Sequence, residues 1–340
     1  MAEQRTGGDR SGAPAPSAEV PPPGSAEVPP PERPALAVAG VRIRDTFAEA
    51  FRMWAARAIV TARDPAWAQE AARCLTGFAT SVIGCKVEAG VEAVLAAGQT
   101  PDGRPGVSVL LFAFDAEGLG KRLVERVGQT VLTCPTTACF DGLPGAQDRM
   151  AVGGQLRFFG DGFQSSKRLD GRRYWRVPVM EGEFLVEESF GAQKAVGGGN
   201  FLISARDADA ALAAAESAVT AMRRLPGVIL PFPGGIVRSG SKVGSRRYKA
   251  MVASTNDAYC PTLRGRIGVA SEVPPEANSV LEIVVNGLDA AAVGDALAAG
   301  IRAACRPGVV EISAGNYGGK LGKHLFHLHD LLGAAPTGGA

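Results

Sequence analysis

The chain has 340 residues, of which 46% are hydrophobic and 21% charged, and its formal net charge is +2. This length predicts about two domains with a sizeable core. Because the basic residues neither form long runs nor alternate with aromatic residues, we expect no nucleic-acid partner. No segment reaches the ~20 apolar residues of a membrane span, and the first ten residues lack the apolar run of a signal peptide. We therefore expect a cytoplasmic protein with no membrane partner.

The two ends of the chain differ from the rest in composition. Residues 1–39 are rich in Pro, Ala, Glu and Ser, and the sequence SAEVPPP occurs there twice, at 17–23 and 25–31. Such a segment has too few large apolar groups to offset the entropy lost on ordering. The sequence predicts a disordered tail over 1–39 and a flexible end over 333–340.

The elements of the first half follow from apolar periodicity and capping signals. Thr46 and Glu49 form a capping-box pattern, and apolar residues then recur at helical spacing to Ala58, which predicts a first helix. Asp64 followed by Pro65 predicts a second helix to about Cys74. Further along the chain we expect strands at 80–87, 107–114 and 130–134, a helix at 117–127, and three apolar, strand-like runs at 155–159, 173–180 and 183–188.

The second half contains an internal repeat with an offset of 81 positions, seen in Pro226-Gly227-Val228 and Pro307-Gly308-Val309. Each copy has a strand, an amphipathic helix and a second strand; the first strands lie at 200–204 and 280–285. Two such units in tandem predict a split βαβ sandwich of ferredoxin type, an α+β fold with helices on one face of an antiparallel sheet.

A polar, glycine-rich and basic segment at 231–262 interrupts this apolar pattern. Its small residues allow close backbone approach, Arg238 and Lys242 offer cationic groups for an anionic ligand, and Ser254, Thr255, Asp257 and Tyr259 offer hydrogen bonds. The segment is not a P-loop, because Ser241 precedes Lys242 and Val243 follows it. The alternative is a solvated loop rich in turn residues.

Glu282 lies within the apolar run 280–285, where a charge is costly. A carboxyl group in an apolar strand has a raised pKa and can donate a proton near neutral pH. The alternative is that Glu282 faces solvent from a half-exposed strand.

Metal ligation is not indicated. The six cysteines form no CxxC pair and lie in or beside apolar runs, so we interpret them as buried thiols. The three histidines fall in KHLFHLHDL, where strand alternation would place His327 and His329 on one face without a third ligand. No GxSxG nucleophile elbow occurs, so an enzyme of this sequence is expected to work by positioning reactants and stabilising charge.

Long motifs in the same order resemble the formylmethanofuran:tetrahydromethanopterin formyltransferase family. They span about residues 41–332 and include DTFAEAF (45–51), TGFATSVIGC (76–85), FFGDGFQ (158–164), PFPGGIVRSGSKVGS (231–245), ASTNDAYCPT (253–262), EIVVNGL (282–288) and ISAGNYGGKLG (312–322). The resemblance implies two ferredoxin-like lobes, which we place at 40–180 and 181–332.

The resemblance also implies a reaction and a site. A formyl group would pass reversibly between the amine of a methanofuran-type carrier and tetrahydromethanopterin through a tetrahedral intermediate, with no permanently bound cofactor. Glu282 falls at the position of the family's proposed catalytic glutamate. The carrier pocket would involve Asn200, Phe201, Pro233, Gly234, Gly235, Arg238, Lys242, Ser254, Thr255, Asp257 and Tyr259.

The implied partners are the two carbon carriers, further copies of the chain in a tetramer, and the other subunits of a formyltransferase/hydrolase complex. The composition suggests the version found in methylotrophic bacteria, which serves the oxidation of formaldehyde to formate. Two alternatives remain: a platform subunit of that complex that has lost catalysis, and a hydrolase that releases formate directly. The second needs an activated water, for which the sequence shows no metal or base arrangement.

Overall fold

The computed structural model describes residues 35–333; most of the tail expected at 1–39, and residues 334–340, lie outside them. The expectation of disorder is wrong for the last residues of that tail. Strand β1 (Leu36–Val38) pairs antiparallel with β2 (Val41–Ile43), and the turn residues Ala39 and Gly40 both have positive φ. Leu36 and Val38 pack against the core, and this burial explains why order begins earlier than the composition suggests.

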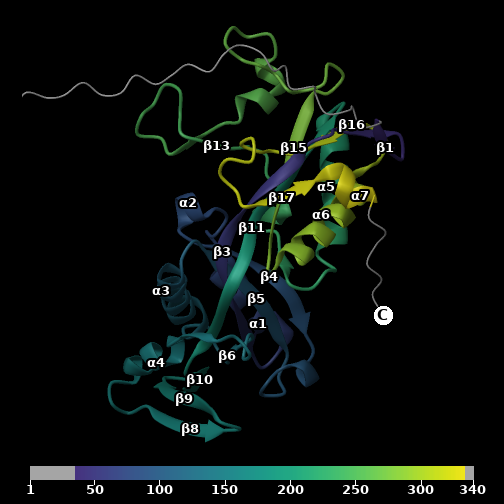
Figure 1. Ribbon diagram of the computed structural model, residues 1–340. Helices are drawn as coiled ribbons and strands as arrows, with labels where there is room; N and C mark the ends of the chain where they lie inside the picture. Colours follow the sequence, from purple (N-terminus) through teal and green to yellow (C-terminus); the bar gives the residue numbers. More distant parts are fainter. Residues whose placement is uncertain (1–34, 334–340) are drawn as a thin grey trace, which may run out of the picture. The chain divides into compact units, whose positions relative to one another are not determined.

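The first half of the described chain builds one βαββαβ unit (Figure 1). Its sheet has the order β4-β5-β3-β6, with every neighbouring pair antiparallel. Both helices bury one side against the same face of these strands, where Leu75, Leu119 and Leu123 are fully buried. In chain order the unit consists of β3 (Phe47–Thr61), α1 (Pro65–Thr76), β4 (Glu88–Leu95), β5 (Gly106–Ala113), α3 (Ala116–Arg126) and β6 (Ala138–Asp141).

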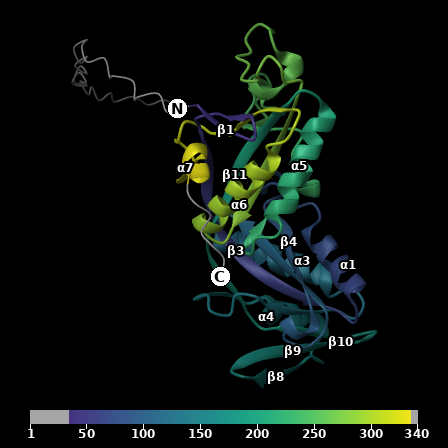
Figure 2. The ribbon, with the colours of Figure 1, turned by 90° about the vertical axis from the view of Figure 1, so that its right-hand side faces the viewer.

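The second half repeats this order of elements. Its strands are arranged β12-β15-β11-β16, again antiparallel throughout, and α5 and α6 lie side by side on one face (Figure 2). The elements are β11 (Phe190–Ala205), α5 (Ala208–Met222), β12 (Val228–Ile229), β15 (Ser279–Gly287), α6 (Ala290–Ala304) and β16 (Val309–Ser313). The strand and helix repeat predicted from the sequence is confirmed.

The long strands β3 and β11 pair antiparallel, from Phe51 with Gly197 to Ala56 with Ala192, and make the two units one continuous sheet. The remaining elements extend its edges or cover its ends. They are α2 (Val82–Cys85), β7 (Asp148–Met150), α4 (Val152–Leu156), β8 (Ser165–Leu169), β9 (Arg172–Val179), β10 (Gly182–Glu187), β13 (Lys242–Val243), β14 (Ala253–Ser254), β17 (His324–His327) and α7 (Leu328–Gly333), with short 3₁₀ turns at 97–99, 157–160, 233–235, 257–259 and 261–263 and a π turn at 127–131.

Several predicted elements of the first half are wrong. The helix expected from Thr46 is the strand β3, which is buried on both faces, so its apolar residues do not show strict alternation. Residues 80–87 hold the short helix α2 rather than a strand, residues 130–134 continue from the π turn, and residues 155–159 are helical. The predicted second helix is confirmed as α1, whose N-cap Asp64 accepts hydrogen bonds from the Ala66 and Trp67 amides.

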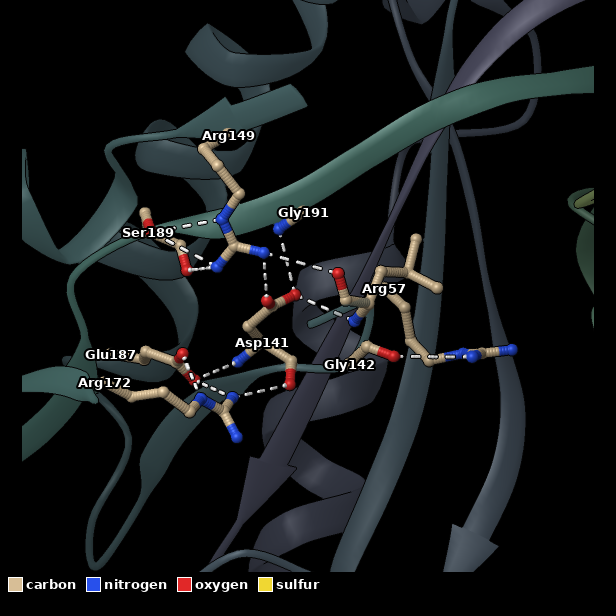
Figure 3. A network of polar contacts seen from close by, with 9 residues as sticks. Arg57, Asp141, Gly142, Arg149, Arg172, Glu187, Ser189 and Gly191 are labelled. Atoms are coloured by element: carbon tan, nitrogen blue, oxygen red, sulfur yellow. Dashed lines mark hydrogen bonds and ion pairs between the residues drawn. The ribbon is translucent and has the colours of Figure 1, made fainter. Parts of the chain in front are cut away.

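A buried polar network ties the end of β6 to β10 and to the start of β11 (Figure 3). Asp141 is 3% exposed. Its Oδ1 accepts from the Leu143 amide at 2.8 Å and the Gly191 amide at 3.0 Å, while Oδ2 forms an ion pair with Arg149 at 2.7 Å. The Asp141 amide donates to Glu187, which Arg172 holds with two hydrogen bonds. A carboxylate this deeply buried is tolerated because its oxygens are hydrogen-bonded and paired.

This network predicts that Gly191→Ala destabilises the protein. A Cβ atom at Gly191 would collide with the Leu143 carbonyl oxygen, a backbone atom that cannot move aside alone. We expect the free energy of unfolding to fall by about 1–3 kcal/mol, measured by urea denaturation. Gly98→Ala, where no atom lies within 4 Å of the added carbon, is the matched control. Equal stability of the two variants would contradict the packing described for Gly191.

Candidate functional site

Glu282 lies on the face of β15 that points away from helices α5 and α6. Its neighbour Ile283 and the next odd residue Val285 are fully buried against those helices, so the alternating Glu282 faces the other side. The residue is half-buried. Loss of hydration raises the pKa of Glu282 to about 7, although a hydrogen bond from Asn200 acts in the opposite direction. Near neutral pH both protonation states of this carboxyl group are therefore populated.

Asn200 fixes the orientation of that carboxyl group. Asn200 lies on the paired strand β11, diagonally across from Glu282, which is in register with Leu202. Its Nδ2 donates to Glu282 Oε1 at 3.1 Å, and its Oδ1 accepts from the Gly315 amide at 2.9 Å. The second contact determines which side of the amide faces Glu282. With Oε1 engaged as an acceptor, Oε2 is the oxygen left to hold a proton.

The segment predicted to form the site does reach Glu282. The Pro233–Gly235 turn leads to Val237, which pairs with Glu282 through two backbone hydrogen bonds of 2.8 and 2.9 Å. The chain then forms the short hairpin of β13 and β14, in which Lys242 is in register with Ser254. These loops lie between β12 and β15, in green at the top of Figure 1.

Two cations of the hairpin region are paired with the same carboxylate. Lys242 Nζ donates to Asp257 Oδ1, and Arg246 forms an ion pair with Asp257 Oδ2 at 3.2 Å. The hydrogen bond from Lys242 holds the pKa of Asp257 below its ordinary value, although burial acts in the opposite direction. In contrast, Arg238 is exposed and makes no hydrogen bond or ion pair with any residue that the structure describes. Of the two predicted anion-binding residues Arg238 and Lys242, Arg238 is therefore the one available to a ligand.

The other predicted residues divide into those that can reach a ligand and those that cannot. Pro233, Gly234 and Thr255 are exposed, and the Ser254 hydroxyl is buried without a hydrogen-bond partner among residues 35–333. Tyr259 is half-buried, and burial raises the pKa of its phenol while the nearby Arg44 lowers it.

Two of the predicted pocket residues have a packing role instead. The Phe201 side chain is fully buried in the core among α5, α6 and the sheet, on the opposite face from Glu282. Its predicted contribution to a pocket is therefore wrong for the side chain. Gly235 is also buried, and a Cβ at this position would lie 2.9 Å from a Val219 methyl group of α5. Glycine is needed here for the contact of the turn with the helix.

Sequence reasoning missed Glu49 and Tyr317. Glu49 is 2% exposed and accepts four backbone hydrogen bonds from the turn that follows β16. Burial would raise the pKa of Glu49, but these four donors hold it below its ordinary value. Tyr317 belongs to the same turn and lies within electrostatic range of Glu282. The signal in the sequence was the glycine-rich motif GNYGGKLG at 315–322, which is typical of a turn with free backbone N–H groups. Because Glu49 was interpreted as part of a helix cap, it was not considered as their acceptor.

The histidine and cysteine predictions have mixed outcomes. His327 ends strand β17 and His329 lies in α7, so the expected shared strand face does not exist. His329 instead contacts the Ile43 carbonyl oxygen at 3.0 Å. Cys139 and Cys305 are buried as expected, whereas Cys74 is exposed. Over residues 35–333, no three His, Cys, Asp or Glu side chains are grouped to hold a metal ion, and none of the helices has the length and apolar character to cross a membrane.

Comparison with known proteins places the chain in a family. The formylmethanofuran-tetrahydromethanopterin formyltransferase model matches residues 36–179, and the model of the proximal lobe of this enzyme matches residues 182–331. The formyltransferase of Methylococcus capsulatus is 58% identical over 301 residues, which cover 87% of this chain and all of the relative. The chain belongs to the formylmethanofuran-tetrahydromethanopterin formyltransferase family.

Two solved structures of this formyltransferase family resemble the present one. The enzyme from Methanosarcina barkeri has 50% sequence identity and a TM-score of 0.83, and the match covers 87% of this chain and 100% of the other. A chain of the formyltransferase/hydrolase complex from Methylorubrum extorquens, crystallised with methylofuran, has 54% identity and a TM-score of 0.84, covering 88% of this chain and 99% of the other. The described chain thus has the fold of a complete formyltransferase.

The Asn200 contact predicts the effect of its removal on Glu282. Because the donated hydrogen bond lowers the pKa of Glu282, Asn200→Ala should raise that pKa further above its ordinary value and keep the carboxyl protonated to higher pH. The measurement is an infrared titration of the carboxyl band, with Glu282→Gln used to assign it. An unchanged or lower titration midpoint in the Asn200 variant would contradict the geometry.

Proposed function

We propose that the protein transfers a formyl group reversibly between the amine of a methanofuran-type carrier and a ring nitrogen of tetrahydromethanopterin. Membership of the formyltransferase family supports this reaction. The observation that carries it in this chain is the environment of Glu282. This half-buried carboxyl group has a pKa of about 7 and is oriented by Asn200, and the polar 231–262 segment reaches it at Val237. Formyl transfer between two amines needs such a group, because a proton must move at each nitrogen.

In the proposed mechanism the acceptor nitrogen attacks the formyl carbon and forms a new C–N bond. The carbonyl π electrons move to oxygen and give a tetrahedral intermediate. Protonated Glu282 donates to this intermediate through Oε2. When the intermediate collapses, the C–N bond to the donor amine breaks, the proton given by Glu282 ends on that nitrogen, and the attacking nitrogen releases its own proton. Returning a proton to Glu282 completes the cycle, and the same steps run in reverse.

The substrate contacts are assigned to groups of the 231–262 segment, which reaches Glu282 at Val237. Pro233 and Gly234 would lie along the carrier, and Ser254, Thr255 and Tyr259 would offer hydrogen bonds. Arg238 would bind an anionic group of a substrate, while Lys242 and Asp257 would act as a pair that shapes the hairpin. We expect no permanently bound cofactor, since both carbon carriers are substrates.

We further propose that each half of the molecule is a ferredoxin-like lobe, within the limits 40–180 and 181–332. The strand orders β4-β5-β3-β6 and β12-β15-β11-β16, each with two helices on one face, support this description. We also propose a cytoplasmic homotetramer that works with partner subunits in methylotrophic formaldehyde oxidation. Relatives that belong to a formyltransferase/hydrolase complex support the partner subunits.

Glu282→Gln tests the mechanism. The amide keeps the shape of the carboxyl group but cannot supply the proton, so kcat/KM for formyl transfer should fall by about 10²–10⁴-fold. Formyl-tetrahydromethanopterin is mixed with a furan-type amine, and loss of the formylated pterin is followed by absorbance. In the wild-type protein the rate should fall as the pH rises through about 7, since the protonated form of Glu282 is then lost.

The same variant has a stability signature. A folded-state pKa raised above the unfolded value stabilises the protein at low pH, and this contribution is lost as the pH rises through about 7. Glu282→Gln should therefore raise Tm by about 2 °C at pH 8 and leave it nearly unchanged at about pH 4, below the ordinary pKa of a glutamate. The exposed Glu276→Gln is the matched control. If Glu282→Gln turns over as fast as the wild type, this carboxyl group has no part in the mechanism. If the folded wild-type protein is inactive even when partner subunits are added, the platform alternative is favoured.

A further inference from the structure

The turn between β16 and β17 is held by a single buried carboxylate. Glu49 Oε2 accepts from the Tyr317 amide at 2.6 Å and the Gly319 amide at 3.0 Å, and Oε1 accepts from the Leu321 amide at 2.7 Å and the Gly322 amide. Gly318 and Gly319 have φ of 69° and 73°, the left-handed conformation that turns successive N–H groups toward one point. The turn is thus a backbone anion site that the protein fills with its own side chain.

Glu49 and Glu282 belong to the same face of the sheet. In the β3–β11 pairing Phe51 is opposite Gly197, and in the β11–β15 pairing Leu202 is opposite Glu282, with a register shift between Val196 and Gly199. Odd residues of β3 therefore share a face with even residues of β15; Met53 and Asn286, for example, both lie close to Gly197. The turn runs along this face from β16 to β17.

Contacts continue from Glu49 to the candidate catalytic group without a gap. Gly315, at the start of the turn, donates to Asn200, and Asn200 donates to Glu282. At the next residue Asn316 Nδ2 donates to the Phe47 carbonyl oxygen at 3.0 Å, beside Glu49 on β3. The turn is therefore anchored on β3 at one side and on the partner of Glu282 at the other.

Tyr317 lies within electrostatic range of Glu282 and next to the hairpin residue Val243. Burial raises the pKa of its phenol, a hydrogen bond from the Val243 amide lowers it, and the Glu282 carboxylate raises it again. The residue is still 38% exposed, so that a ligand at Glu282 can contact it. Its backbone amide is one of the four donors to Glu49, which couples the position of the phenol directly to that carboxylate.

We infer that Glu49 is a positioning residue for formyl transfer, which holds the 315–322 turn so that Asn200 keeps its contact with Glu282 and Tyr317 stays within range of that carboxyl group. Apart from its contacts with β3, the turn that Glu49 holds contacts the site through Gly315 and Asn200. The inference rests on the proposed function, and it adds to it a residue that never touches the substrates.

The experiment compares Glu49→Gln, Tyr317→Phe and the double variant. Glutamine keeps the shape of Glu49 but directs an NH₂ group at backbone donors, which releases the turn. We expect faster hydrogen exchange of the Tyr317, Gly319, Leu321 and Gly322 amides in Glu49→Gln, and kcat lower by about tenfold. If Glu49 acts through Tyr317, the double variant should be little slower than Tyr317→Phe alone. The exposed Glu216→Gln is the control for the charge change.

A second variant covers the case in which Glu49→Gln fails to fold. Asn316→Ala removes the side-chain contact of the same turn with Phe47 of β3 without placing any group near the carboxylate, and it should lower kcat and be non-additive with Tyr317→Phe in the same way. Additive effects of the single changes, or unchanged exchange of the four amides in Glu49→Gln, would overturn the inference. Hydrogen exchange can be measured without turnover. If the wild-type protein is inactive but the four amides exchange faster in Glu49→Gln, the proposed function is refuted and the anchoring of the turn by Glu49 is not.

Discussion

The antiparallel pairing of β3 with β11 is the constraint on which the arrangement of the candidate site depends. Each strand is a member of one βαββαβ unit, and their pairing from Phe51 with Gly197 to Ala56 with Ala192 turns two small sheets into one. Because paired residues share a face, this register also decides that Glu49 and Asn200 lie on the side away from the helices. A shift of one residue between paired strands would turn one of these polar groups toward the apolar core, where its burial without partners would be costly.

The properties of Glu282 arise from two opposing effects at the same atom. Partial burial disfavours the charged carboxylate, and the hydrogen bond from Asn200 favours it. The first effect is the larger, and the pKa settles at about 7 rather than at the extreme of an isolated buried acid. Glu49 shows the opposite balance on the same face, since four backbone donors outweigh its burial and keep it charged. The fold thus holds one carboxyl group ready to exchange a proton and another permanently ionised.

The sequence predicted those features that depend on local patterns. The repeated strand and helix skeleton of the second half, the Asp64 N-cap and the exceptional position of Glu282 in an apolar strand all follow from nearest neighbours along the chain. The errors come from tertiary context. An alanine-rich strand buried on both faces, such as β3, looks like an amphipathic helix, and Glu49 then looks like part of a cap. That Glu49 binds a turn some 270 residues away was beyond any local pattern.

The pairing of charges in the 231–262 segment changes which residue can recognise an anion. Lys242 and Arg246 share the carboxylate of Asp257, whose side chain is only 14% exposed. An anionic ligand that approached Lys242 would have to displace a partly desolvated carboxylate, and leaving that carboxylate unpaired is unfavourable. Arg238 carries no such cost, because its guanidinium is exposed and unpaired among the described residues, one position from the Val237 contact with Glu282. Of these two predicted cations we therefore propose Arg238 for anion recognition, and we assign the Lys242–Asp257 pair to holding the hairpin.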